Sequence, residues 1–522
     1  NTLDNLHFVK QRLGDEAYKM HRMLTGINSS TFTTWLKHGR LFVNGKTFGV
    51  KGQDQGPMAF FKTLGSRDAE NLVQWVSAKR AEQLEAEGRE NWLDKETRDA
   101  IFEKVGTHAS DGRTWAELNN TLQKFNKNIL DVAQQAGLID PDARAEWESN
   151  FYIPFNRIME DPETYETFLA GPRRNRQHIS AQIRRLKGGE GKIDPMGNLF
   201  RNWMFLLDAS ARNMARENAF DVGSQIGIIE EVSKKELVNI LGSQSVTRFA
   251  ARKTTATRAA KVFDTEAEAK AWIEGKPGYQ IEQRKYNSVT FGRMRDFGIL
   301  SFQRKGEPVY FKTLDQDLFE ALSEVDTTAF NNVFMKMMGG AKRWLSYGVT
   351  FGPAFRLRNM LRDTVHVAIV SKSFRPFMDS ARGFVKAMKE DEDFKEYSAT
   401  GFAFGSSYIH TDDPAHASRM IKKLIKQEGD GVVDNILNNL KKLFRVWEKI
   451  GEASENAARL GLYTNIRKQG KTAFEAGFEA RDLMDFSMRG GSQTVQILTR
   501  IIPFLNARAQ GLYKLSRSAH EN

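Results

Sequence analysis

Two histidines and two aspartates lie within the seven-residue stretch HTDDPAH, from His410 to His416. Imidazole and carboxylate groups this close together could bind a divalent cation. No H-E-x-x-H pattern or comparable spacing accompanies them, and Asp413, directly before Pro414, is equally well explained as the N-cap of a helix. The other histidines are scattered along the chain. The sequence therefore favours a helix start over a metal site, and we expect no metal.

Two glycine-containing runs approach the pattern of phosphate-binding loops without matching its spacing. Gly45-Lys46-Thr47 has Arg40 at the position where the Walker pattern needs a glycine. The run KGGEGKIDP, residues 187–195, carries Ile193 where the pattern has Ser or Thr, so we interpret it as a glycine hinge leading into a helix. The chain contains no cysteine, and no serine lies in a G-x-S-x-G elbow. We expect no enzyme and no cofactor.

Basic residues are in excess and are concentrated in two acid-free stretches. Lys and Arg number 77 against 65 Asp and Glu, which gives a net charge of +12 and favours contact with nucleic acid, anionic lipid or an acidic protein. Acidic residues are absent between Glu166 and Glu190 and between Glu236 and Asp264. The candidate phosphate-binding residues in these stretches are Arg173, Arg174, Arg176, Arg184, Arg185, Lys187, Arg252 and Lys253. Few aromatic residues accompany them, so phosphate contact is favoured over base recognition. A solvated basic face would explain the same residues without DNA.

The elements that must position these residues are predicted to be mostly helices. With 522 residues, 40% of them hydrophobic, and only 12 prolines, the chain can fill several helical cores. The expected fold class is mainly α, a multi-helix assembly with a short N-terminal hairpin at Asn44-Gly45 and a small α+β insert at about 262–325 that turns at Lys305-Gly306. We divide the chain into an N-terminal helical region (1–160), a basic helical region (161–261), the insert, and a C-terminal helical domain (326–522). No apolar run approaches the 18 residues or so needed to span a bilayer.

A helix beginning at Pro353 is predicted to be central to the fold. Ala354, Leu357, Leu361, Val365 and Ala368 recur at helical spacing, so we expect their shared face to be buried.

Beside that apolar stripe, Arg358 and Arg362 form one polar row of the same helix, and Asn359 and Asp363 form the next. They could form a surface lattice of ion pairs. Alternatively, they could form a rim that holds a neighbouring helix or an anionic partner, because Arg presents a planar fork of donors. After this helix, residues 374–389 are expected to form a basic amphipathic helix.

The stretch from Val495 to Leu515 has a wide apolar face, only positive charges, and a break at Pro503. Pro503 removes one helical hydrogen bond and kinks the chain, which predicts two shorter helices meeting at an angle. Such a basic amphipathic segment can dock onto a partner helix or lie on an anionic host membrane. We favour docking, because so apolar a face left exposed would promote aggregation.

Several runs carry a resemblance to a known family. They are GVT (348–350), PAFRLRN (353–359), Arg362-Asp363, ARDLMDFS (480–487) and IPFLNAR (502–508). In these runs the chain resembles the large polyvalent protein-associated domains found in very long polypeptides of tailed bacteriophages. The resemblance implies a non-catalytic portion of such a polypeptide, carried in the virion interior and delivered with the genome to the host envelope or cytoplasm.

The resemblance and the basic stretches together lead to an expected function. The chain would be a structural segment of an internal virion, or ejection, protein that assembles through helices with other virion proteins or copies of itself and contacts phage DNA. The alternative is a DNA-associated accessory module that acts in the host cytoplasm beside linked enzymatic domains. A third hypothesis is a hydrolase built on residues 410–416. The chain opens on Asn1 rather than Met, as expected of a fragment or a processed product.

Overall fold

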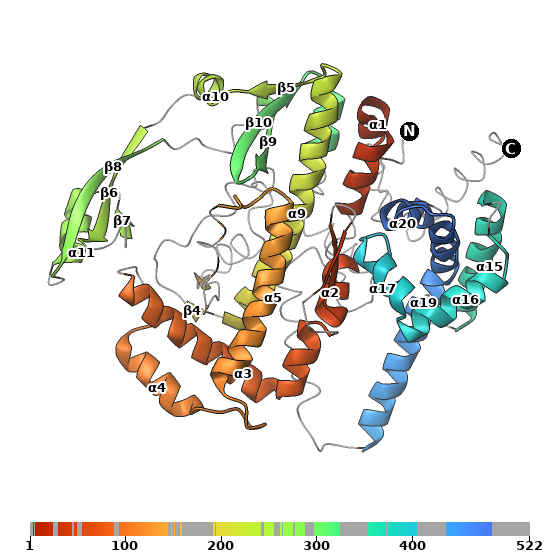
Figure 1. Cartoon of the computed structure of the whole chain (residues 1–522), viewed down its shortest axis with the longest axis horizontal. Coiled ribbons are helices and arrows are strands. Elements are labelled where there is room, and N and C mark those ends of the chain that lie inside the picture. Colours follow the sequence, from red (N-terminus) through yellow and green to blue (C-terminus); the bar gives the residue numbers. More distant parts are fainter. Residues whose placement is uncertain are drawn as a thin grey trace, which may run out of the picture.

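The computed structural model describes residues 4, 6–24, 30–43, 46–49, 55–87, 93–142, 144, 148, 151, 157–158, 192–193, 195–241, 245–254, 261–263, 265–274, 277–287, 297–323, 353–371, 374–403 and 435–482. Helices dominate these ranges, and the strands form small antiparallel sheets (Figure 1). The helices are α1 His7–Met23, α2 Phe32–His38, α3 Pro57–Ala86, α4 Lys95–Val105, α5 Trp115–Gln135, α9 Pro195–Gln225, α10 Lys234–Leu241, α11 Glu266–Ile273, α13 Gln316–Ser323, α15 Pro353–Val370, α16 Met378–Lys389, α17 Glu392–Ala399, α19 Asn435–Lys468 and α20 Ala473–Asp482. The strands are β1 Arg40–Val43, β2 Lys46–Gly49, β3 Arg157–Ile158, β4 Lys192–Ile193, β5 Ile229–Val232, β6 Ser245–Lys253, β7 Lys261–Phe263, β8 Tyr279–Asn287, β9 Ile299–Arg304 and β10 Glu307–Thr313. The predicted mainly α class with a small β insert is confirmed.

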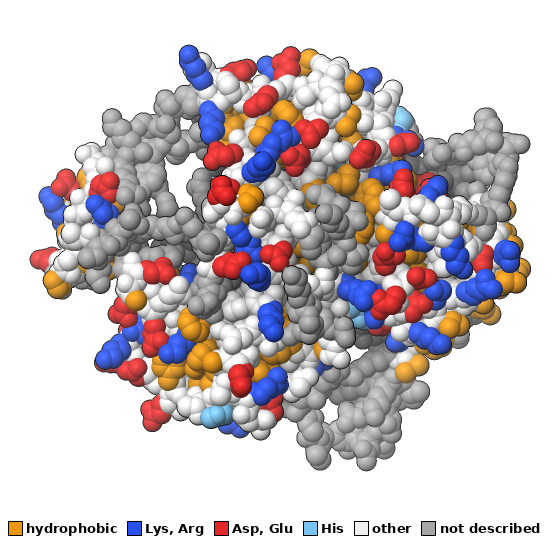
Figure 2. Space-filling view, in the orientation of Figure 1, with side chains coloured by type: hydrophobic (Ala, Val, Ile, Leu, Met, Phe, Trp, Pro, Cys, Tyr) orange, Lys and Arg blue, Asp and Glu red, His pale blue; other side chains and the backbone are white. Residues whose placement is uncertain are grey.

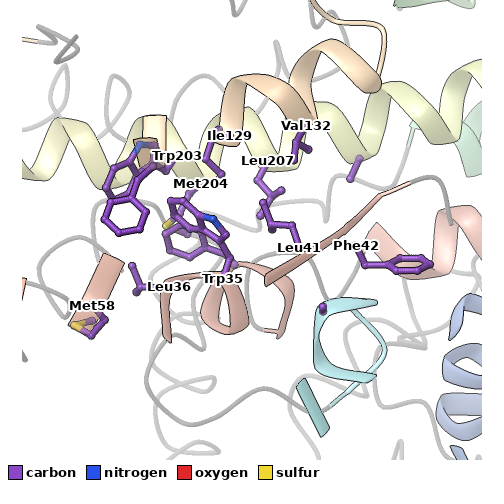
Figure 3. Close-up of a cluster of buried hydrophobic side chains, with 14 of the residues drawn as sticks. Trp35, Leu36, Leu41, Phe42, Met58, Ile129, Val132, Trp203, Met204 and Leu207 are labelled. Atoms are coloured by element: carbon purple, nitrogen blue, oxygen red, sulfur yellow. The ribbon is translucent and has the colours of Figure 1, made fainter. Parts of the chain in front are cut away.

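The N-terminal helices meet in an aromatic core made by α2, α5 and α9 (Figure 3). Trp35 of α2 and Trp203 of α9 are fully buried and lie edge to face, with ring centroids 5.1 Å apart. Each indole N–H donates to an asparagine of α5: Trp35 to Asn128 Oδ1 and Trp203 to Asn126 Oδ1, both at 2.7 Å. A buried N–H without a partner costs about 1–3 kcal/mol. The two amides therefore allow this core to hold two tryptophans.

The hairpin of β9 and β10 is anchored to the same helices through main-chain groups. Its turn residues, Lys305 and Gly306, have φ of 52° and 81°, the left-handed conformation that a two-residue hairpin turn requires. Asn213 of α9 donates to the carbonyls of Ala136 and Gln303 at 2.6 and 2.7 Å, and its Oδ1 accepts from Gln303 N at 2.6 Å. This single amide ties the end of α5 to the hairpin. The hairpin predicted at Lys305-Gly306 is confirmed, as are the strands β1 and β2 on either side of Asn44-Gly45.

Six of the described strands, including those of this hairpin, form two antiparallel sheets of three strands each. The first has the order β5-β10-β9 and packs on α9. The second, β7-β6-β8, carries α11 on one face, where Trp272 contacts Phe263 and Tyr279, and it extends away from the helical body at the left of Figure 1. Because β5 and β6 precede residue 262, the β structure begins upstream of the insert that the sequence predicts.

The C-terminal helices pack around α19. An added Cβ at Gly383 of α16 would lie 1.9 Å from Ala457 O, and one at Gly461 of α19 would lie 2.4 Å from Asp379 O. The two helices therefore touch almost backbone to backbone. The closeness is possible only because both contact positions lack a side chain.

The two ends of the described chain come together in one core. Ser30 and Thr31, at the start of α2, donate through their hydroxyls to the carbonyls of Ser398 and Ala399 of α17, at 2.6 and 3.1 Å. The rings of Phe42 of β1 and Phe474 of α20 lie parallel, 6.5 Å apart. α2 and β1 are thereby fixed against helices more than 300 residues later in the sequence.

Candidate interaction surface

The helix predicted to be central begins at Pro353, as expected, but it lies at one edge of the molecule (Figure 1). The expectation that its apolar stripe is buried is wrong. Four large apolar side chains of α15 are 42–56% exposed, and they are Leu357, Leu361, Val365 and Ile369.

The reason is that α15 packs through its neighbouring, more polar side. Among the side chains of α15 that the structure describes, the buried ones are Thr364, His366 and Val367. Thr364 Oγ1 lies 2.6 Å from Ser380 Oγ of α16, and Asp363 interacts electrostatically with the buried Arg459 of α19. Residues two apart on a helix point to nearly opposite sides. Once the side with Val367 is packed inward, Val365 is directed outward.

The predicted polar rows of α15 only partly form a lattice. Arg362 donates to Asp363 Oδ1 from Nε and Nη2 at 3.2 and 3.0 Å, so one ion pair joins the two rows. Asn359 is partly buried. Arg358 is exposed and has no ion-pair partner among the residues that the structure describes. The arginines therefore lie beside the exposed apolar residues.

α16 and the turn before it continue this surface. We call α15, α16 and the described residues between them the elbow. From residue 357 to residue 389, every exposed side chain that the structure describes is either apolar or basic. The apolar ones are Leu357, Leu361, Val365, Ile369, Pro376, Phe377, Met378, Ala381 and Val385, and the basic ones are Arg358, Arg362, Arg375, Arg382 and Lys389.

The acids of the elbow face inward. Asp379 is 2% exposed, and its Oδ2 accepts from the backbone N–H of Arg375 and from Asn465 Nδ2 of α19, both at 2.7 Å. Arg382 Nη1 lies 3.6 Å from its Oδ1. Together with the close approach at Gly383, these contacts fix α16 on α19. The elbow is thus a preorganised surface of cationic and apolar groups.

Ionisable groups join the C-terminal end of α16, at Glu390, to α2. His38 Nε2 lies 3.2 Å from Glu390 Oε2, and Lys449 of α19 lies 3.5 Å from Glu390 Oε1. The hydrogen bond from His38, with the positive charges of Lys37 and Lys449, lowers the pKa of Glu390 to about 2. Burial raises the pKa of Glu452, three residues after Lys449, to about 7. The strength of this junction therefore depends on pH.

The structure describes only two of the eight candidate phosphate-binding residues, Arg252 and Lys253. Arg173, Arg174, Arg176, Arg184, Arg185 and Lys187 lie outside the described residues. Arg252 lies on β6, and its Nε is 3.3 Å from Glu282 Oε2 of β8. The acid-free stretch is therefore not free of acid in space, because β8 brings a carboxylate to Arg252 from outside that stretch. Lys253 lies on the same strand, and its backbone pairs with that of Tyr279.

The remaining candidates of the sequence fall outside the described ranges. They are the stretch from His410 to His416, Pro503 and the segment from Val495 to Leu515. Within the described part of the chain, no three His, Asp or Glu side chains converge so that they could hold a metal ion. In the same part, no helix is both long and apolar enough to cross a membrane.

The sequence predicts the helix that forms the α16 half of the elbow, but it does not predict that this helix leaves apolar side chains exposed. The basic amphipathic pattern of residues 374–389 correctly predicts a helix. It does not show that Phe377, Met378 and Val385 are left uncovered, because amphipathic helices ordinarily bury their apolar side.

Comparison with known protein-family models, curated proteins and solved structures gives no match to this chain.

Proposed function

We propose that this chain is a non-catalytic structural segment of a bacteriophage internal virion protein, which assembles through helices with other virion proteins and contacts the genome during delivery. The resemblance of residues 348–363, 480–487 and 502–508 to phage polyvalent-protein domains supports the setting. The elbow supports the mode of action, because its exposed side chains are all apolar or basic. Rows of large apolar side chains on a surface mark interaction sites.

The elbow fits attachment better than it fits a purely structural face. Four apolar residues of α15 and three of α16 and its preceding turn are about half exposed, while polar groups such as Thr364 and Asp379 are packed inside. Leaving apolar area in water forgoes about 25 cal/mol per Å². Such an arrangement is expected where a partner covers the surface during part of the protein's life.

Purified virions of a phage that encodes this chain provide the test. Mass spectrometry should find peptides from residues 1–522 in intact particles washed free of host protein. A phage carrying the double variant Leu361→Ser and Val365→Ser should package less of the chain or deliver its genome less efficiently. Leu314→Ser, which changes a residue that is 61% exposed outside the elbow, serves as the control and should behave as wild type. Absence of the chain from virions would refute the proposal.

A DNA-associated accessory module is the second candidate, and one observation favours it. The backbone register of β6 and β8 places Arg248 opposite Arg284 and Thr247 opposite Lys285, which gathers basic residues in one small sheet. If these residues and the block from Arg173 to Arg185 meet phosphates, duplex binding should be independent of sequence. Each contact should add about −0.9 to the log–log dependence of affinity on salt. Replacing Arg173, Arg174, Arg176, Arg184 and Arg185 by Gln should flatten that slope, and an unchanged slope would exclude the block from DNA contact.

A further inference from the structure

We propose that the elbow is a peripheral membrane-binding surface that takes the anionic phospholipid face of a bilayer. Its apolar side chains would enter the boundary between headgroups and acyl chains, and its basic side chains would meet lipid phosphates. This inference rests on the elbow being an attachment surface, as in the proposed function, and it names the host membrane as the partner of that surface during genome delivery. The elbow shares no residue with the segment at residues 495–515.

The charge of the elbow selects an anionic partner. Arg358, Arg375 and Lys389 have no ion pair within the described part of the chain, and Arg362 and Arg382 are exposed although each lies beside an inner acid. No exposed acid lies between residues 357 and 389 in that part of the chain. Pairing of two elbows would therefore bring cations against cations, which disfavours a second copy as the occupant.

The exposed apolar side chains of the elbow favour a bilayer over nucleic acid as the partner. Phosphate backbones are met by basic and polar side chains, and large apolar residues gain little there. Phe377 is 60% exposed at the turn between the two helices and Met378 follows it at 49%, with Val385 exposed further along α16. Phe377 also has a φ of 62°, a conformation that non-glycine residues rarely adopt, in the turn that leads into α16.

The spread of the charges favours a lipid surface over a single acidic protein helix. The five basic residues extend from 358 to 389 over two helices and a turn, and Figure 2 shows hydrophobic side chains beside basic ones at the right-hand margin, where α15 and α16 lie. Fluid headgroups can move to each of these separated positions. Each basic residue near an anionic surface strengthens binding by about fivefold.

Flotation with vesicles tests the inference on the full chain of 522 residues. Vesicles of phosphatidylcholine with 30% phosphatidylglycerol are compared with pure phosphatidylcholine, and the chain should float with the anionic vesicles only. The variant Val365→Ser, Phe377→Ser and Val385→Ser should weaken this binding at least tenfold. The variant Arg358→Gln, Arg375→Gln and Lys389→Gln should weaken it about 100-fold, from three fivefold steps. Leu314→Ser is the control for exposed apolar residues and should bind as wild type.

Three results would overturn the inference. The first is absence of binding to anionic vesicles, or equal binding to both compositions. The second is a dimer in light scattering that the elbow variants convert to a monomer, which would identify a second copy as the occupant. The third is binding that survives both elbow variants and disappears on replacing Ile501, Ile502 and Leu505 by Ser, which would assign membrane contact to residues 495–515. Because all elbow substitutions change exposed residues, unchanged circular dichroism should accompany each result. Absence from virions would refute the proposed function and leave the flotation result standing, so the two failures can be told apart.

Discussion

Two valines on one helix provide a sharp test of how α15 is oriented. Val365 is 50% exposed and Val367 is 1% exposed, although both lie in the middle of the helix and two residues apart. Val→Ala removes two methyl groups, worth about 0.8 kcal/mol each when fully buried. It also gains a few tenths of a kcal/mol, because Ala is the better helix former.

The structure predicts different outcomes for the same substitution. At Val365 only about half of the methyl area is buried, so the loss of about 0.8 kcal/mol is largely offset by helix propensity, and the free energy of unfolding should change by less than about 0.5 kcal/mol. At Val367 the full loss applies and a cavity is added, so the free energy of unfolding should fall by about 1.5–2.5 kcal/mol. Urea unfolding followed by circular dichroism would measure both. Equal losses, or a larger loss at Val365, would mean that the sequence-based assignment of the buried face was right after all.

Four further predictions concern the contacts that hold the fold. Asn128→Leu removes the acceptor of the Trp35 N–H and should lower the free energy of unfolding by about 1–3 kcal/mol, whereas in a Trp35→Phe background the same change should cost much less in denaturant titrations. Gly383→Ala should force α16 away from Ala457 O and destabilise by at least about 1–3 kcal/mol in thermal melts, while Ala381→Ser on the exposed side of the same helix should have little effect. Folding favours protonated Glu452, so the stability this group contributes is present below its ordinary pKa of 4.5 and is lost as the pH rises to about 7. Glu452→Gln should therefore raise the free energy of unfolding at pH 8 and leave it unchanged at pH 4. Glu390 behaves in the opposite way, since its stabilisation is present above pH 4.5 and is lost as the pH falls toward 2, and His38→Ala should remove much of that acid dependence.

Local chemistry allowed several elements to be predicted from the sequence. The strands around Asn44-Gly45 and the turn at Lys305-Gly306 follow from residues that tolerate positive φ. The start of α15 follows from Pro353, because a proline suits the first turn of a helix. Each depends on a few adjacent residues. The mainly α class follows equally from composition, because helix propensities add along the chain.

The tertiary structure decided which surfaces those elements present. The spacing of Leu357, Leu361 and Val365 indicates an apolar face, but it carries no information on whether another helix covers it. α15 turns a more polar side inward because Thr364 and Asp363 find Ser380 and Arg459 on helices that follow later in the chain.

Residues far away in the sequence also decided the ion pairs and hydrogen bonds of single side chains. Arg252 lies in an acid-free stretch of sequence, yet it meets Glu282 because β8 pairs with β6. Trp35 and Trp203 are satisfied by Asn128 and Asn126, which lie 93 and 77 residues away. Propensity and turn geometry act between neighbours in the chain, whereas burial and charge pairing act between neighbours in space, and the second kind is settled only when the helices have packed.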